Sequence, residues 1–198
     1  SSSINLSKVW GNSPFTTSVN IRQSQNNSTG TMSLTLPNFS LSMNRIFPFR
    51  KASSSGKKWY EKINVTWNMN ANNTAASMPI EAFMGPEMGK YMKFGVTHAI
   101  PIKASYNVLR HFNLNVGVNY NEAWNFKTLQ KHWDEDNGMI VADTVSGMKS
   151  LRTFNTTASL STMLYGTFQF KGKGSLKAIR HVMNVSLGYT YAPDFSTP

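Results

Sequence analysis

Apolar and neutral polar residues alternate along this chain in segments about as long as one membrane crossing. The clearest segment is residues 62–70. Because successive side chains of a β-strand point to opposite faces, one face of this segment carries Ile63, Val65, Trp67 and Met69. The other face carries Lys62, Asn64, Thr66, Asn68 and Asn70. A strand of about 9 to 11 residues spans a bilayer. The pattern therefore predicts a strand whose apolar face meets lipid and whose Asn64, Thr66 and Asn68 point inward to a wet interior.

The same two-residue period recurs in other parts of the chain. It is regular in residues 112–121 and 183–191, and less regular in residues 92–102 and 154–170. Near the start, two alternating segments flank residues 26–30 (NNSTG), whose residue types favour a turn, so we expect a hairpin there. The phase shifts across Pro37, and because proline cannot donate to the sheet ladder we expect a bulge or a break. The pattern predicts about eight to ten strands.

Three stretches lack this alternation, and we expect them to be loops. Residues 50–58 are Ser-rich and basic, residues 71–90 contain Asn, Pro and Gly, and residues 131–149 hold the densest group of acidic side chains, four of the nine.

The strand pattern and the composition together favour a membrane barrel. No apolar run approaches the roughly 18 residues of a transmembrane helix, and only 15% of the residues are charged. A soluble β-sandwich would also have two-faced strands. However, no segment is apolar on both faces, and aromatic residues gather at strand ends, as in interface girdles: Trp59 with Tyr60, Trp124 with Phe126, and Tyr189 with Tyr191. We expect an all-β fold, an antiparallel transmembrane β-barrel segment of about eight to ten strands.

The two ends of the sequence suggest an interior segment of a longer chain. Residues 1–6 lack the basic and apolar regions of a signal peptide. Alternation continues almost to the last residue. We therefore expect residues 1–198 to be part of one barrel domain in a cell outer membrane.

The chain is strongly basic, with 20 Lys and Arg against nine Asp and Glu and a net charge of +11. An anionic partner is expected, and on charge alone it could be nucleic acid, a lipid surface or a phosphorylated glycolipid. One basic cluster is Arg45, Arg50, Lys51, Lys57, Lys58 and Lys62. A second is Lys171, Lys173, Lys177 and Arg180. These residues either pair with lipid head groups from solvated loops or attract the phosphates of a transported ligand.

The residues that usually carry chemistry are not arranged for it. There is no cysteine, and the four histidines have no metal-motif spacing. The acidic segment 132–136 (HWDED) lacks the glycine and the spacing of a calcium loop, and no G-x-S-x-G motif occurs. We expect no enzymatic activity, no metal and no cofactor. An outer-membrane acyl hydrolase, with its Ser and His on strands, is the enzymatic alternative.

Three groups of residues carry a family resemblance. The first is residues 34–39 (LTLPNF) and 43–49 (MNRIFPF), followed by residues 58–63 (KWYEKI). The second is residues 124–128 (WNFKT) with 133–135 (WDE), and the third is residues 177–182 (KAIRHV) with 189–195 (YTYAPDF). In this order they resemble the lipopolysaccharide-assembly outer-membrane barrel proteins, the LptD family, in a divergent Asn-rich subfamily.

The resemblance implies a large closed barrel that receives lipopolysaccharide from periplasmic bridge proteins and delivers it to the outer leaflet, with a plug lipoprotein inside. It also implies a periplasmic jelly-roll domain before the barrel, which this sequence does not contain. The family has no catalytic residues to carry over. The expected contacts to lipopolysaccharide phosphates are Arg45, Arg50, Lys51, Lys57, Lys58, Lys62 and Arg180. A porin or nutrient-uptake barrel would share every alternation argument and is the alternative function.

Overall fold

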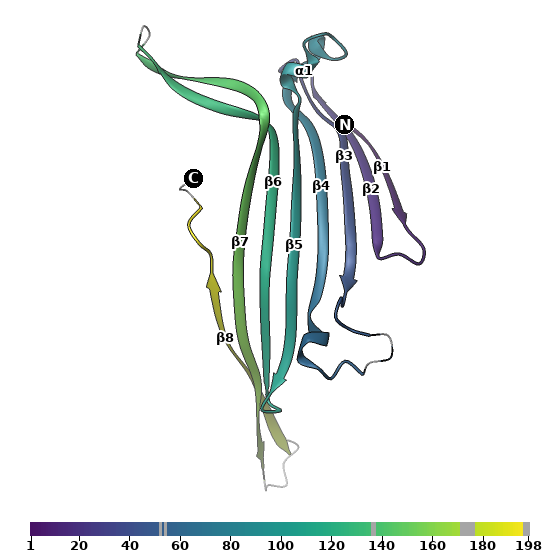
Figure 1. Cartoon of the computed structure of the whole chain (residues 1–198), viewed down its shortest axis with the longest axis vertical. Helices are drawn as coiled ribbons and strands as arrows, with labels where there is room; N and C mark the ends of the chain where they lie inside the picture. Colours follow the sequence, from purple (N-terminus) through teal and green to yellow (C-terminus); the bar gives the residue numbers. More distant parts are fainter. Residues whose placement is uncertain (52, 54, 136–137, 171–176, 196–198) are drawn as a thin grey trace. The chain divides into compact units, whose positions relative to one another are not determined.

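The computed structural model describes residues 1–51, 53, 55–135, 138–170 and 177–195 (Figure 1). The described residues form eight strands in one sheet, in which each strand is hydrogen-bonded to the next in sequence. The strands are β1 (Ser2–Val9), β2 (Phe15–Asn26), β3 (Thr31–Ile46), β4 (Asn64–Pro79), β5 (Lys93–Val108), β6 (Phe112–Asp134), β7 (Met139–Gln169) and β8 (Ala178–Tyr191). The sheet is antiparallel. The expected all-β fold of eight to ten strands is confirmed.

Helical structure in the described part of the chain is limited to three short segments. These are the 3-10 turns η1 (Trp59–Lys62) and η2 (Ile80–Ala82) and the single-turn helix α1 (Met88–Tyr91). Among the described residues, no helix is long and apolar enough to cross a membrane.

The β2–β3 hairpin contains the irregularity that the sequence predicted at Pro37. Asn20 pairs with Asn38 and Arg22 pairs with Thr35, so Leu36 and Pro37 both stand opposite Ile21. This extra residue is a β-bulge, and it matches the absence of an N–H on Pro37. Its effect is to reset the phase of β3, because Leu34 before the bulge and Phe39 after it then share one face.

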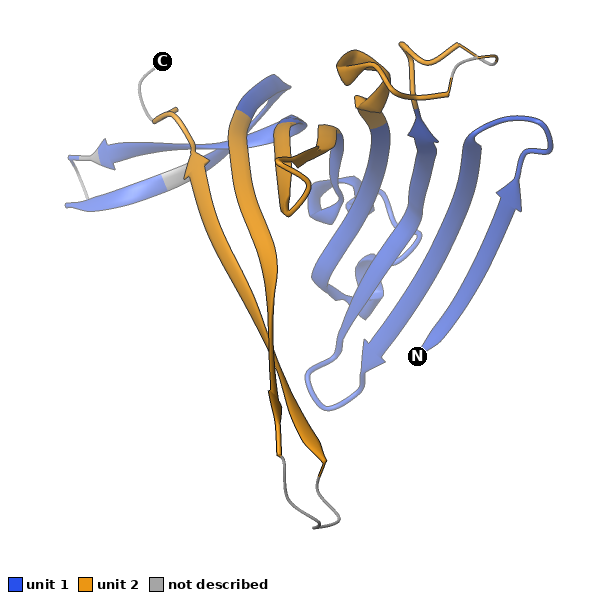
Figure 2. Cartoon of the chain, turned by 90° about the horizontal axis from the view of Figure 1, so that it is seen from below, with its two compact units in different colours: residues 1–46, 66–100, 120–153 blue, residues 47–65, 101–119, 154–198 orange. Residues whose placement is uncertain are grey.

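Contacts between residues divide the chain into two compact units (Figure 2). Unit 1 comprises residues 1–46, 66–100 and 120–153, and unit 2 comprises residues 47–65, 101–119 and 154–198.

Unit 1 holds the hydrophobic core found among the described residues. Its buried side chains are Met32 and Leu34 on β3 and Ala75 and Met78 on β4, and Met78 is fully buried. The segment that follows β4 packs against them with Ile80, Ala82, Met88, Tyr91 and Met92. The amide of Ile80 donates to the carbonyl of Gly30 at 3.1 Å, which fastens this segment to the β2–β3 turn. We call residues 80–92 the cap.

Unit 2 contains the β7–β8 pair, which runs without a break from Thr156 opposite Tyr191 to Gln169 opposite Ala178. In the same unit, the neighbouring strands β5 and β7 come close to Gly117 of β6. A Cβ atom there would lie 3.2 Å from the Thr157 hydroxyl oxygen and 3.3 Å from the Ile102 carbonyl. The glycine therefore leaves room for its neighbours.

Several expected boundaries are wrong. Residues 71–90 are not one loop, because β4 continues to Pro79 and is followed by η2 and α1. Residues 131–149 are not one loop either, because β6 continues to Asp134 and β7 begins at Met139. The strand expected at residues 62–70 begins at Asn64, since Lys62 is the last residue of η1. Strand β1 was not predicted. Where a strand is longer than expected or was not expected, hydrogen bonding to a neighbouring strand extends a segment whose own pattern is weak.

Candidate functional site

The expected phosphate contacts fall in three places. Arg45 lies near the end of β3 in unit 1 and is exposed. Arg50, Lys51, Lys57, Lys58 and Lys62 lie on the connection between β3 and β4 in unit 2. Arg180 lies on β8 in unit 2. Of the other cluster, Lys177 is exposed, and Lys171 and Lys173 lie outside the described residues.

Four of these cations lie over aromatic rings. The Arg50 guanidinium is 5.8 Å from the ring centre of Phe47, and the ammonium groups of Lys58 and Lys62 are each 5.7 Å from the rings of Tyr60 and Tyr106. Arg180 lies 4.6 Å from the ring of Tyr165. A cation over an aromatic face is stabilised by the ring and keeps its other side available to an anion.

Aromatic side chains organise the lysines of the β3–β4 connection. Trp59 and Tyr60 pack edge to face with ring centres 5.8 Å apart, and the Tyr106 hydroxyl donates to the Trp59 carbonyl at 3.1 Å. The hydrogen bond with Tyr60, followed by the charge of Tyr60 and of Glu61, raises the pKa of Lys58 above its ordinary value. Lys58 therefore stays positively charged at neutral pH.

The polar face of unit 1 is hollowed. One hollow of about 440 Å³ is lined by Ser40, Asn68, Asn70, Thr97 and Asn121, together with other side chains. These residues come from four strands, and their hydroxyl and amide groups can donate and accept hydrogen bonds.

A second hollow of about 830 Å³ lies on the same unit and brings together three lysines, Lys90, Lys93 and Lys127, with the neutral polar residues Asn70 and Asn72. The Lys127 ammonium donates to the carbonyls of Gly89 and Met92 at 2.6 and 2.8 Å. It thus ties β6 to the cap. The sequence did not predict this group, because Lys90 ends an expected loop, Lys93 lies in the strand expected after it, and Lys127 is 34 residues farther on.

The four histidines do not form a catalytic or metal group in the described part of the chain. His132 lies 3.5 Å from the carboxylate of Asp143, and both side chains are exposed. Among the described residues, no group of three or more His, Asp or Glu could hold a metal ion. Asp136 of the acidic segment lies outside the described residues.

A family model described as "LptD protein" matches residues 1–198, which is the whole chain. The chain belongs to the LptD family. Comparison with curated proteins and with solved structures finds no match. The LptD family acts in transport and assembly of lipopolysaccharide at the outer membrane and is not an enzyme family. The two-faced antiparallel strands are consistent with a fragment of such a barrel.

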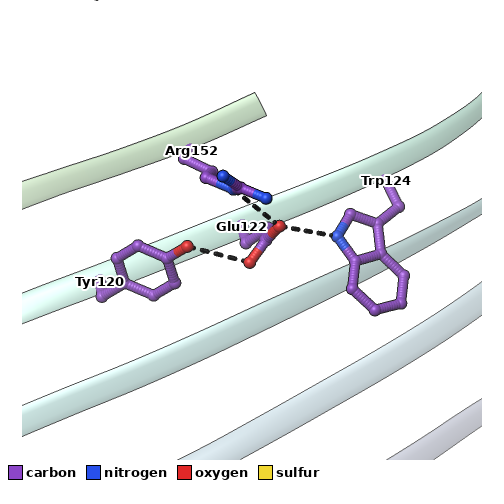
Figure 3. Close-up of polar contacts among 4 residues, drawn as sticks. All are labelled: Tyr120, Glu122, Trp124 and Arg152. Atoms are coloured by element: carbon purple, nitrogen blue, oxygen red, sulfur yellow. Dashed lines mark hydrogen bonds and ion pairs between the residues drawn. The ribbon is translucent and has the colours of Figure 1, made fainter. Parts of the chain in front are cut away.

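This member of the LptD family also has a network of polar contacts on β6 and β7 that the sequence analysis missed (Figure 3). The carboxylate of Glu122 accepts three hydrogen bonds: from the Tyr120 hydroxyl at 2.9 Å, the Trp124 indole at 2.9 Å and the Arg152 guanidinium at 3.0 Å. The Glu122 side chain is 16% exposed and that of Arg152 is 68% exposed. The signal was present, because Tyr120, Glu122 and Trp124 stand two residues apart and so share a strand face.

Proposed function

We propose that this chain is part of the outer-membrane barrel that passes lipopolysaccharide to the outer leaflet. The family match over all 198 residues carries this proposal. In it, residues 1–198 belong to one barrel domain, and the partners are lipopolysaccharide, a plug lipoprotein and the periplasmic bridge proteins.

The two-faced strands suggest how each part of the substrate is accommodated. The face with Asn68, Asn70 and Asn121 lines the interior, where amide groups exchange hydrogen bonds with sugar hydroxyls and water. The face with Ile63, Val65 and Trp67 meets lipid, because amide side chains without partners in hydrocarbon would cost several kcal/mol each. Passage of an amphiphile along such a wall breaks no covalent bond, so the proposed role requires neither a catalytic group nor a cofactor.

Cations supply the recognition of phosphate in this proposal. The expected residues Arg45, Arg50, Lys51, Lys57, Lys58, Lys62 and Arg180 are joined by Lys93 at the second hollow. Clustered positive charge raises the local concentration of an anionic ligand. Arg50, Lys58, Lys62 and Arg180 are the strongest candidates in the first set, because their rings hold them in place.

Photo-crosslinking in working cells tests this role. A photoreactive residue is placed singly at position 58, 62 or 93 of the full-length protein, and lipopolysaccharide adducts are counted. Position 8 is the control, because Lys8 also lies over an aromatic ring, 4.4 Å from Trp10, but is outside both basic clusters. We expect adducts at one or more of the first three positions and fewer at position 8.

Two outcomes would contradict the proposal. One is an absence of adducts at all basic positions in a strain that still delivers lipopolysaccharide to its surface. The other is free conduction of small solutes by the purified protein together with normal surface lipopolysaccharide after depletion, which would favour a porin or nutrient-uptake barrel.

A further inference from the structure

Strand β6 is too long to lie wholly within a bilayer. It has 23 residues, whereas a tilted membrane strand needs about 9 to 11. If its first half crosses the membrane, its second half must lie outside the hydrocarbon. Strand length alone does not show where β6 leaves the hydrocarbon, so we locate this point from the side chains.

The apolar face of β6 changes character part-way along the strand. Phe112, Leu114, Val116 and Val118 alternate as expected for a lipid-facing strand. The next three positions with the same phase are Tyr120, Glu122 and Trp124. At these positions the face carries the Glu122 carboxylate, which accepts three hydrogen bonds, one of them from the exposed Arg152 of β7.

The same change occurs on the neighbouring strands. The His98 ring of β5 stacks nearly parallel to the Trp67 indole of β4, with ring centres 6.0 Å apart and planes 8° apart. On its other side it lies 4.6 Å from the Trp124 indole of β6. Within the described residues, His98 Nε2 is buried and has no hydrogen-bond partner. The row of amphipathic rings therefore crosses three strands and continues to Arg152 on a fourth.

Farther along β3 and β4, protein covers the sheet. The cap packs over Met32 and Leu34 of β3 and Ala75 and Met78 of β4, which are 4% exposed or less. Lipid-facing side chains need no such cover, because the hydrocarbon solvates them. A cover made by the chain itself indicates that water surrounds this end of the strands.

We propose that Trp67, His98, Tyr120, Glu122, Trp124 and Arg152 form a belt that contacts the lipid head groups of one bilayer leaflet and fixes the depth of the sheet in the membrane. The belt rests on the proposed membrane function, and it adds the level at which the strands leave the hydrocarbon. The described residues of the β6–β7 hairpin that follow the belt, 125–135 and 138–151, lie in the aqueous phase.

These residues could lie in hydrocarbon, in water or at the lipid head groups. In hydrocarbon, a carboxylate and a guanidinium are strongly disfavoured even as a pair. In water, the half-buried rings of Trp67, Tyr120 and Trp124 would leave part of an apolar surface unprotected. At the head groups, Tyr and Trp place an apolar body in lipid and a polar end in water. Arg152, which is largely exposed, can there reach a lipid phosphate while it keeps Glu122.

Spin labelling of the full-length protein in phospholipid vesicles, with any cysteine outside residues 1–198 replaced, tests the belt. The sequence has no cysteine, so a single cysteine can carry the label at Val118, which is 38% exposed, or at Met148, which is 59% exposed. We expect the label at position 118 to collide with oxygen and to be shielded from a water-soluble nickel chelate. At position 148 we expect ready collision with the chelate.

The outcomes separate the belt from the function on which it rests. A label at 148 as shielded as that at 118 would overturn the belt and leave the membrane role intact. A label at 118 that is open to the chelate would overturn the membrane role itself.

As a second measurement, Arg152→Leu should lower chelate collisions at 148 severalfold, because the sheet sinks deeper into the bilayer when the cation is lost. The matched control Lys131→Leu, on the hairpin beyond the belt, should not, and equal effects would count against the belt.

Discussion

At the scale of residues, the Glu122 carboxylate is bound by two neutral donors and one charged donor. Glu122 is the acceptor for a phenol, an indole and a guanidinium at once (Figure 3). Each donor loses its partner if the carboxylate is removed, and an unpaired donor costs more than the bond itself contributed. The contribution of Glu122 therefore depends on all three donors rather than on the Arg152 ion pair alone.

We expect Glu122→Leu to destabilise the protein more than Glu122→Gln. Gln keeps a carbonyl oxygen that can accept one or two of the three hydrogen bonds, whereas Leu keeps none. The measurement is the midpoint of urea unfolding in detergent micelles, with Glu81→Gln, an exposed site on η2, as the control. Equal midpoints for the Leu and Gln variants would show that the network does not contribute to stability.

At the scale of elements, the cap completes a buried core whose fully covered side chains come from β3 and β4. Met78 is fully buried at its centre, at the end of β4. The residue just before it, Ser77, has a positive φ of 55°. This sparsely populated conformation lets β4 turn the Met78 side chain into the core.

Met78→Ala should lower the free energy of unfolding by about 2–5 kcal/mol, because it leaves a cavity in a packed cluster. The matched control is Met148→Ala, since Met148 is 59% exposed and loses few contacts. Both are measured by denaturant unfolding of the refolded protein. A cost at position 78 no larger than that at position 148 would mean that the cap does not pack as described.

The sequence predicted strands best where apolar and polar residues alternate regularly within the segment itself. The alternation around Trp67 and from Phe112 to Tyr120 gave the strands, and Pro37 gave the bulge. Strand β1 and the second half of β4 are poor in β-branched and aromatic residues, and hydrogen bonding to neighbouring strands extends them. On β4, the side-chain amide of Asn73 also donates to the Leu36 carbonyl at 2.8 Å. The partners of Glu122 include Arg152, 30 residues away, a separation that only the pairing of β6 with β7 can close.

At the scale of the whole molecule, the sheet has two ends in its strand order. Within the described residues, β1 and β8 each have one neighbouring strand. An unpaired strand exposes a row of backbone donors and acceptors, which is especially costly in lipid. A stable membrane form therefore needs a further partner for each of these two edges.

Residues 1–198 alone are expected not to yield a compact, heat-resistant monomer after refolding in detergent. The test is gel mobility with and without heating, and a closed eight-stranded barrel, which is the smallest common type, serves as the positive reference. A heat-modifiable monomeric band from residues 1–198 would show that the edges can satisfy each other, and would count against a larger barrel.

The strand order also determines how the sheet can assemble during folding. Each strand is bonded to the one directly before it in sequence, so no pairing has to wait for a distant segment. Closing the next hairpin always costs less chain entropy than joining remote strands. Growth can proceed from either end, one hairpin at a time, and each newly added strand serves as the template for its successor.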